Sequence, residues 1–436
     1  MGLKFIATGD TIITEYYTRN YEGYQKLRDF IRKADVRFNN METPLVDEWC
    51  RVSAFSGGHW LRANTSLLDE LEDFGFNCYS FANNHNLDFF YEGMLSTLEA
   101  FEKRDLPYAG AGRDLAAATR HCKVETPKGS VSMLAFTTAF EPSAAAGPAN
   151  GKIPGRPGVS VLRHKVKYFV TKEQMDALRE IADGSVVNGR LKNRLALGSV
   201  SVSDAVFPFD KLEFAVGEPG RMSYGNEYDI KRLTAAVEEA VADADHCVVY
   251  IHTHETKGVR DDEPDYFVEE FARKAIDLGA QAVICSGTHQ IKAVEIYKGV
   301  PIFYSIANFF FRPHDLTFYP QEWFEKYNFD TSLSIEEAEN IRSKGGTRGL
   351  MTQAYNFQAM MPVIEWDEAG NCTSIAAMPI ALGFDDPKTK GFPRLADPCT
   401  TQTLFEKLVD CCKPYGTQVT LGEDGLFYFQ CDEFQK

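Results

Sequence analysis

Short apolar segments that end abruptly in polar residues recur along this chain of 436 residues, and they constrain its fold more than any other feature. Each segment is rich in β-branched or aromatic residues, as strands are, and carboxylates, amides or imidazoles follow it. These polar ends lie at residues 9–10, 39–42, 82–85, 252–255 and 285–289. Helical patterns separate several of the segments, so the sequence predicts an α/β fold in which parallel strands alternate with helices.

The carboxyl ends of parallel strands meet at one edge of a sheet, where folds of this class keep their sites. The same edge would gather two carboxylates, Asp10 and Glu42, with several amides and up to four histidines. Side chains of these types bind metal ions or exchange protons. The pattern therefore predicts a metal or acid–base site.

The charge balance argues against one class of partner. The chain has 46 Lys and Arg residues against 62 Asp and Glu residues, a net charge of -16. A protein this acidic lacks the basic surface that neutralises phosphates, so we expect no nucleic acid partner. A small peptide or amide substrate remains compatible with this composition.

The sequence also predicts a location. Its first residues lead directly into a strand, without the basic and apolar stretches of a secretory signal, and no apolar run is long enough to cross a bilayer. The 10 cysteines are scattered and form no Cys-x-x-Cys motif. We therefore expect a cytoplasmic protein without a membrane anchor, and we make no prediction of its oligomeric state.

Changes in the sequence pattern along the chain predict the domain organisation. Alternating strand and helix patterns fill residues 1–140 and resume at about residue 228. The segment between them, about 141–228, begins with a loop rich in Ala, Gly and Pro and is expected to be an insertion that acts as a lid over the sheet edge. Residues 1–312 would form the main domain, and residues 313–436 would form an extension that packs on it.

The histidines after the strands carry most of the chemical signal. His252 and His254 are separated by one residue, which places both on the same side of an extended chain. Two such imidazoles can bind a metal ion or act as acid and base; a pair of buried structural histidines is the alternative. Asn84 and His85 suit a ligand or hydrogen-bonding cluster, with an Asx turn that caps the next helix as the alternative.

The remaining candidates are weaker when each is taken alone. Asp10 follows a glycine, a pair that is also common at turns and helix caps, and Glu42 could be a solvated turn residue beside Pro44. His289 lies two residues after Gly287, which would let the backbone approach a ligand closely.

An ordered set of longer motifs runs along the chain. It comprises Gly9-Asp10, Asn40-Met41-Glu42-Thr43-Pro44, Ala82-Asn83-Asn84-His85 with Asp88, the loop 110–113, and residues 252–255, 287–309 and 391–396. Together these motifs resemble the CapA family of capsule or poly-γ-glutamate synthesis proteins, which belongs to the calcineurin-like metallophosphoesterase superfamily. The resemblance implies a two-sheet α/β/β/α sandwich, the metallophosphatase fold, with an insertion and a small C-terminal extension.

The resemblance also implies a site. Its metal ligands would be Asp10, Glu42, Asn84, His252 and His289, and His85 would lie beside them as an acid. Two positions depart from the pattern of a dimetal centre. Ile12 replaces the histidine of the Asp-x-His motif, and Ser286 lies where many relatives have histidine. We therefore expect at most one divalent ion (Mn, Fe or Zn), or none.

We expect a soluble CapA-like enzyme that acts on a peptide or amide substrate, such as a poly-γ-glutamate-like chain, by acid–base chemistry. The reaction is hydrolysis or Cα epimerisation, and the sequence leaves both open. The expected catalytic residues are His85, His252, His254, Asp10 and Glu42, and the expected substrate-binding residues are Asn40, Asn83, Arg62, Glu255 and Asn308. The alternatives are a non-catalytic subunit of capsule synthesis and a metal-dependent phosphoesterase. The phosphoesterase fits less well because phosphoryl oxygens need two cations or an arginine clamp.

Overall fold

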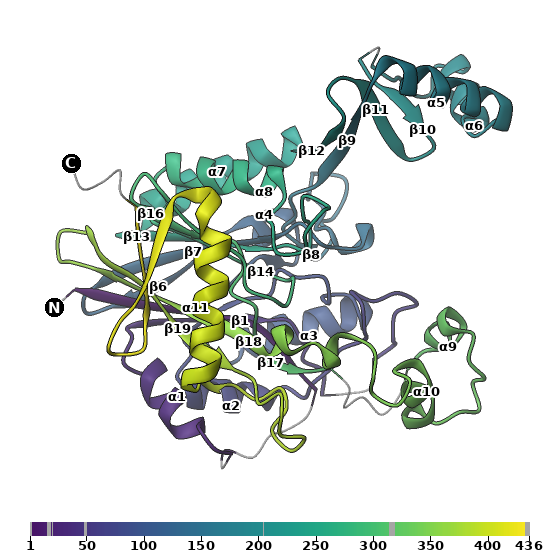
Figure 1. Ribbon diagram of the computed structural model, residues 1–436. Coiled ribbons are helices and arrows are strands. Elements are labelled where there is room, and N and C mark those ends of the chain that lie inside the picture. Colours follow the sequence, from purple (N-terminus) through teal and green to yellow (C-terminus); the bar gives the residue numbers. More distant parts are fainter. Residues whose placement is uncertain are drawn as a thin grey trace.

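Two β-sheets that pack face to face form the centre of the protein in the computed structural model (Figure 1). It describes residues 2–14, 19, 21–47, 50–203, 205–313 and 319–431. Direct ring contacts join the sheets. Phe38 and Tyr250 lie 4.9 Å apart between ring centroids, and His246 stacks on Trp366 at 4.4 Å. Apolar and aromatic side chains from both sheets therefore share one core.

The larger sheet has ten strands and combines both ends of the chain. Its order is β21 (Thr417–Leu421), β22 (Phe427–Cys431), β19 (Cys372–Ala381), β18 (Gln358–Trp366), β1 (Leu3–Ile13), β2 (Val36–Met41), β3 (Cys78–Ser80) and β4 (Tyr108–Ala109), while β17 (Asn308–Arg312) pairs with β1 and β20 (Arg394–Leu395) with β19. Strands β1 to β4 are parallel, whereas β18 is antiparallel to β1. The C-terminal part, which we expected to pack on the core, thus supplies strands of the core sheet itself.

The smaller sheet has six strands. Its order is β15 (Val294–Tyr297), β16 (Val300–Phe303), β14 (Ala282–Ser286), β13 (His246–His252), β7 (Gly129–Thr137) and β6 (Cys122–Thr126). Strand β13 is parallel to both of its neighbours and buried along its whole length, as its uninterrupted apolar run predicts.

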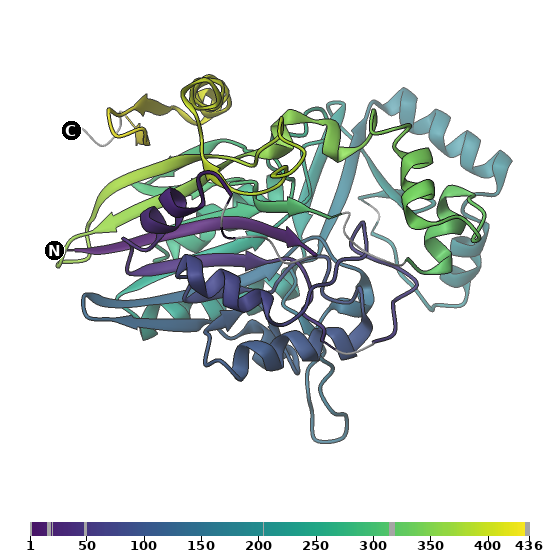
Figure 2. The same cartoon turned by 90° about the horizontal axis from the view of Figure 1, so that it is seen from below.

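Helices cover the outer faces of both sheets, so the layers follow the α/β/β/α order that the resemblance implied (Figures 1 and 2). On the six-stranded side lie α7 (Glu227–Asp243) and α8 (Tyr266–Asp277), and on the ten-stranded side lie α1 (Tyr24–Ile31), α2 (Leu67–Phe74) and α3 (Phe90–Glu102). Helix α11 (Pro398–Cys412) packs on β21, β15 and β19. Among the described residues, none of the helices has both the length and the apolar character of a membrane span.

Strand β1 is distorted where it reaches the site. Its register shifts beside Asp10 against both β2 and β17, as β-bulges near active sites do. A Cβ on Gly9 would lie only 1.7 Å from the carbonyl oxygen of Ala307, so only glycine lets the two strands approach this closely. The N–H of Asp10 donates to that same carbonyl oxygen at 3.1 Å. This close approach fixes the position of the Asp10 side chain.

The segment expected to be an insertion folds into a unit of its own. Strands β9 (His164–Val170), β10 (Phe207–Phe209), β11 (Leu212–Val216) and β12 (Gly220–Gly225) form a four-stranded sheet that carries α5 (Lys172–Ser185) and α6 (Gly189–Ala196). Figure 1 shows that this unit projects away from the two central sheets. Preceding it, β8 (Gly158–Val159) pairs with β5 (Ala111–Gly112), which leads to α4 (Leu115–Thr119).

The segment that connects β17 to β18 in the sequence contributes to a second, small core. Helices α9 (Gln321–Tyr327) and α10 (Ile335–Arg342) pack Tyr319, Trp323, Phe324 and Ala338 against Trp60, apart from the main core. The ring of Tyr319 stacks on Trp323 at 4.5 Å. This cluster anchors the segment 319–342 on the loop that contains Trp60.

Lys292 generates a prediction about stability. It is fully buried, and its ammonium donates to the carbonyl oxygen of Glu263 at 3.2 Å. Burial lowers its pKa from 10.5 to about 8. The charged form is therefore costly at neutral pH. We expect Lys292→Met to raise the free energy of unfolding at pH 7 by about 3–4 kcal/mol, because the shift from 10.5 to about 8 costs ~1.4 kcal/mol per pKa unit.

Because the folded pKa lies below the unfolded one, the wild type gains stability as the pH rises from about 8 towards 10.5. The advantage of the methionine variant should shrink over that window, as measured by urea unfolding at several pH values. Lys231→Met, on the exposed face of α7, is the matched control and should show no such trend. An advantage that does not change with pH would contradict this account.

Candidate active site

The strand ends converge on one edge, between the two sheets. Asp10 on β1 lies 3.6 Å from Nδ1 of His252 at the end of β13, measured from Oδ1. Its other oxygen lies 3.8 Å from Nδ1 of His289. Glu42, directly after β2, brings Oε1 to 3.7 Å from Nε2 of both His85 and His252. Residues from both halves of the sequence therefore share one cluster.

Asp10 is a buried carboxylate with several donors. It accepts hydrogen bonds from Nδ2 of Asn40 at 2.8 Å, from the backbone N–H of Gly287 at 2.9 Å and from the hydroxyl of Ser286. Burial would raise its pKa, but the hydrogen bond and charge of His252, with His289 and Ser286, outweigh burial and lower the pKa to about 2. Asp10 is therefore an anion at neutral pH.

Glu42, unlike Asp10, has no donors to stabilise its charge among the described residues. It is fully buried, and neither of its carboxylate oxygens has a hydrogen-bond partner among the described residues. Burial, together with the charges of Asp10 and Asp88, raises its pKa well above the ordinary value. A buried carboxyl without partners must hold a proton or receive a cation. The environment thus separates the protonation states of two neighbouring carboxyls, as acid–base sites do.

His85 is oriented by Asp88, a residue of the motif to which the sequence reasoning gave no role. Its Nδ1 lies 2.7 Å from Oδ2 of Asp88, and the backbone N–H groups of Gly57 and Leu61 donate to that carboxylate at 3.1 and 2.8 Å. This pairing leaves Nε2 of His85 facing Glu42. The spacing of three residues between His85 and Asp88 in a tight turn was the available signal.

Asn84 orients the imidazole of His252. The side-chain N–H of Asn84 donates to the carbonyl oxygen of Gly57 at 2.6 Å, so its Oδ1 faces the histidine. Nε2 of His252 donates to this oxygen at 2.7 Å and therefore carries a proton. Asn84, expected as a metal ligand, here acts on the imidazole.

Two further imidazoles complete the cluster. The ring of His254 lies 5.2 Å from that of His252 and 6.0 Å from that of His289, between centroids. Burial lowers the pKa of both His254 and His289, and the charge of His252 adds to this effect. Nδ1 of His289 lies 2.9 Å from Oδ1 of Asn308. Both rings are therefore neutral at physiological pH and can accept a proton or bind a metal.

These side chains form two groups that could hold a metal ion. One combines Asp10, Glu42 and His252, the other combines Glu42, His254 and His289, and the ligand atoms of each group lie within 4.8 Å of one another. Glu42, whose two oxygens have no hydrogen-bond partner among the described residues, belongs to both groups. Carboxylate and imidazole are suitable ligands for Mn, Fe and Zn, so the residues fit a divalent ion.

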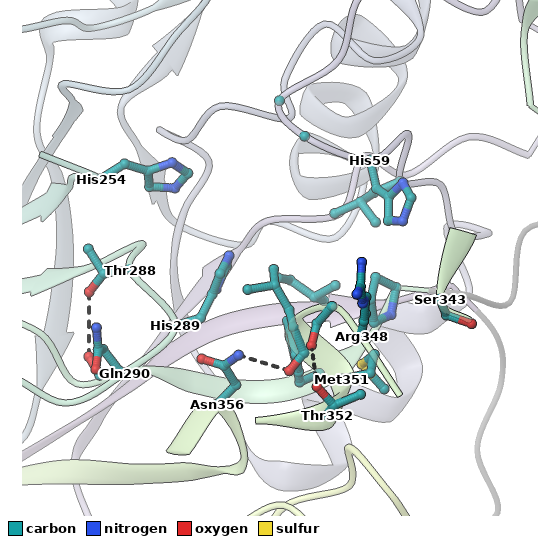
Figure 3. Close-up of a pocket in the computed structure, with 18 of the residues that line it drawn as sticks. His59, His254, Thr288, His289, Gln290, Ser343, Arg348, Met351, Thr352 and Asn356 are labelled. Atoms are coloured by element: carbon teal, nitrogen blue, oxygen red, sulfur yellow. Dashed lines mark hydrogen bonds between the residues drawn. The ribbon is translucent and has the colours of Figure 1, made fainter. Parts of the chain in front are cut away.

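A pocket of about 790 Å³ opens in front of the cluster (Figure 3). His85 and His254 line it beside His289, while its far wall comes from residues of the segment 327–356 and from Lys390. None of its lining residues belongs to the segment 141–228. The lid role of that insertion remains a prediction, and the wall that the sequence reasoning missed comes from α9, α10 and the turn after them.

Three residues expected to contact substrate have partners within the protein instead. Nδ2 of Asn83 donates to the carbonyl oxygen of Met41, and Glu255 accepts from Thr253 and from the backbone of His254. The guanidinium of Arg62 lies 5.8 Å from the ring of Phe89. None of the three lines the pocket, so the structure gives each a supporting position, and their contact with substrate stays a prediction.

Comparison with known proteins identifies a family and several relatives of this chain. The sequence model of "Bacterial capsule synthesis protein PGA_cap" matches residues 4–313. The chain is 28% identical to "Uncharacterized protein y4sH" of Sinorhizobium fredii, over 96% of this chain and 91% of that protein. It is 23% identical to "Capsule biosynthesis protein CapA" of Bacillus anthracis, over 68% of this chain and 54% of the relative. It is 24% identical to "PGA biosynthesis protein CapA" of Bacillus subtilis, over 66% and 56%. The chain thus spans about half the length of the two CapA proteins.

The raised pKa of Glu42 predicts how its removal affects stability. A carboxyl whose folded pKa exceeds the unfolded value of 4.5 contributes stability below that pH, and loses it as the pH rises through the folded pKa. In the presence of chelator, Glu42→Gln should therefore become increasingly more stable than the wild type as the pH rises above the unfolded pKa of 4.5. Urea unfolding at several pH values measures this difference.

The exposed variant Glu239→Gln, on α7, is the control and should follow the wild type at every pH. If Glu42→Gln is less stable than the wild type at pH 8, the carboxylate has partners that this geometry does not contain.

Proposed function

The chain belongs to the family of bacterial capsule synthesis proteins, as its motifs indicated, and from this premise we propose that it is an enzyme that transfers protons on a peptide or amide substrate. One observation carries the proposal: neutral bases line the pocket, and a buried acid lies behind them, 3.7 Å from the imidazole of the pocket residue His85. Glu42 has a raised pKa, while His254 and His289 have lowered ones. Such a set can donate and accept protons near neutrality.

The arrangement of the two sheets favours proton exchange at Cα, which inverts a residue. His85 follows β3 of the ten-stranded sheet, whereas His254 and His289 follow β13 and β14 of the six-stranded sheet, and all three line the pocket. A substrate there meets acid–base groups from two sides. One imidazole would take the Cα proton, the electron pair would move into the adjacent carbonyl as an enolate, and a group on the other side would return a proton to Cα. The reaction is balanced without a co-reactant.

Hydrolysis of an amide bond is the second candidate, and the metal groups favour it. A divalent cation would be held by Glu42 with Asp10 and His252, or by Glu42 with His254 and His289. When bound, such an ion would stabilise negative charge on a carbonyl oxygen and activate water. The chain's own acid and base groups would then move the protons of the attacking water and of the leaving amine.

The names of two relatives support an amide-linked substrate. Two of them are named for capsule and PGA biosynthesis, and PGA, poly-γ-glutamate, is an amide polymer. The pocket volume of about 790 Å³ suits a few peptide units. We therefore place glutamyl or related peptides first among the substrates to test.

Variants of the imidazoles test catalysis. His85→Ala and His254→Ala should each lower turnover by about 10²–10⁴-fold, the usual effect of removing an essential acid–base group. Mass spectrometry in deuterated water, with γ-linked glutamate oligomers and linear α-peptides, separates the two reactions. Epimerisation incorporates deuterium at Cα without cleavage, whereas hydrolysis yields shorter products.

His121→Ala is the matched control, because this histidine pairs with Asp243 away from the pocket. It should retain full activity. If His85→Ala and His254→Ala also retain full activity, the cluster at the sheet edge is not the catalytic centre.

Elemental analysis tests the metal content. Because Ile12 and Ser286 provide no imidazole, we expect protein purified without chelator to hold at most one equivalent of Mn, Fe or Zn. If an ion is bound, Glu42→Gln should lower the content, because Glu42 lies in both ligand groups. Two equivalents bound by the wild type would show that a dimetal centre forms without these imidazoles.

A further inference from the structure

Two of the basic side chains that line the pocket have no carboxylate partner among the described residues. Arg348 and Lys390 both line it, and Figure 3 shows Arg348 near His59, on the side opposite His254. Within the described ranges, no carboxylate lies within the 4.0 Å ion-pair distance of either cation. Their charges are therefore available to a ligand, in a chain whose net charge is -16.

The backbone holds both residues in defined turns. The N–H of Arg348 donates to the carbonyl oxygen of Ser343 at 2.9 Å, which closes the turn after α10. Lys390 precedes Gly391, whose φ of +90° and close approach to Phe311 would not tolerate a side chain. The carbonyl oxygen of Gly391 accepts from the N–H of Phe311 at 2.9 Å. This bond ties the Lys390 turn to β17, the strand beside Asp10.

Aromatic rings connect Lys390 with the catalytic cluster. The ring of His289 lies 5.3 Å from that of Phe311, which lies 5.4 Å from that of Phe357. The ammonium of Lys390 lies 5.0 Å from the centre of the Phe357 ring and 4.3 Å from that of Phe384. These contacts restrain the lysine without neutralising it. A series of packed rings therefore joins the imidazole of His289 to the ammonium of Lys390.

The other charges of the pocket define the anion that fits. Glu339 also lines it, but Nε of Arg342 lies 2.8 Å from its carboxylate and neutralises it. Asp261 adds a negative charge to the lining. A dianionic phosphate would meet repulsion from this residue, whereas a single carboxylate meets less and suits the planar guanidinium.

We propose that Arg348 and Lys390 form a subsite that binds a carboxylate of the substrate while another part of the substrate lies at the histidines. The inference rests on the proposed function and specifies its substrate class, a peptide that carries a carboxylate several bonds from the reacting atom. A side-chain carboxylate and a C-terminal one share this chemistry.

Calorimetric binding to the full chain tests the subsite. The probes are a γ-linked glutamate trimer, the same trimer with all its carboxylates amidated, an uncharged-side-chain peptide with a free C-terminus, and a phosphoserine peptide with amidated ends. Arg348→Gln and Lys390→Gln should each weaken binding of the trimer about tenfold, the loss of one charge-assisted hydrogen bond. Amidation should weaken it more, and added salt should weaken binding of the acidic trimer alone.

The matched controls are Lys344→Gln and Lys388→Gln, exposed lysines on the same two turns that do not line the pocket. They should bind the trimer as the wild type does. Binding of the free C-terminus peptide that depends on Arg348 would support the subsite and identify the terminal carboxylate as its ligand. The proposal is overturned if the amidated trimer binds as tightly as the acidic one, if the phosphoserine peptide binds more tightly, or if the controls lose as much affinity as the subsite variants.

The same experiment separates this inference from the proposed function. His85→Ala should bind the trimer normally and turn it over slowly. If the wild type binds the trimer through Arg348 but changes no peptide, the proposed function fails and the subsite stands. If it turns over neutral peptides as fast as acidic ones and does not bind the trimer, the subsite fails and the proposed function stands.

Discussion

The buried carboxylate of Asp10 is the interaction on which the rest of the site depends. Its donors come from both sheets: Asn40 lies on β2 of the larger sheet, and Ser286 and Gly287 end β14 of the smaller one. A buried anion without such donors would cost several kcal/mol, so the sheets must stack in the one register that supplies them. The glycine at position 9 makes this possible by letting β1 approach β17. The hydrogen bonds of Asp10 therefore fix both the packing of the two sheets and the geometry of the site.

The negative charge of Asp10 changes the pKa of the second carboxyl of the site, that of Glu42. The charge of Asp10 and burial raise the pKa of Glu42, and no donor compensates its oxygens within the described structure. A protein selected for stability alone would place an amide or an apolar group there. The retained carboxyl is useful only if a proton or a cation is exchanged at this position. This is why Glu42, although it makes no hydrogen bond with the described residues, is the most informative residue of the cluster.

The sequence predicted the edge where the site lies because strand ends are a local signal. Each polar tail follows its own strand, and parallel strands bring such tails together, so the amino-acid order alone is enough to group Asp10, Glu42, His252 and His289. The pairing of β18 with β1 joins residues more than 350 positions apart and leaves no local trace. The far pocket wall depends on the packing of Trp323 against Trp60, which is likewise non-local. Asp88 was named in the motif but given no role, because a residue that only orients a histidine resembles any turn carboxylate.

The residues of the site that strand-end patterns predicted lie within the part of the chain that the family model matches, and the far pocket wall lies mostly beyond it. Every member of the acid–base cluster lies within residues 4–313, the part that the family model matches. Arg348 and Lys390 lie beyond it, on turns that the C-terminal strands and the small aromatic core hold in place. A wall built outside the shared part can change its charge without disturbing Asp10 or the stacking of the sheets, because their hydrogen bonds do not involve it. The proposed acid–base chemistry and the proposed carboxylate subsite therefore occupy one pocket without sharing residues.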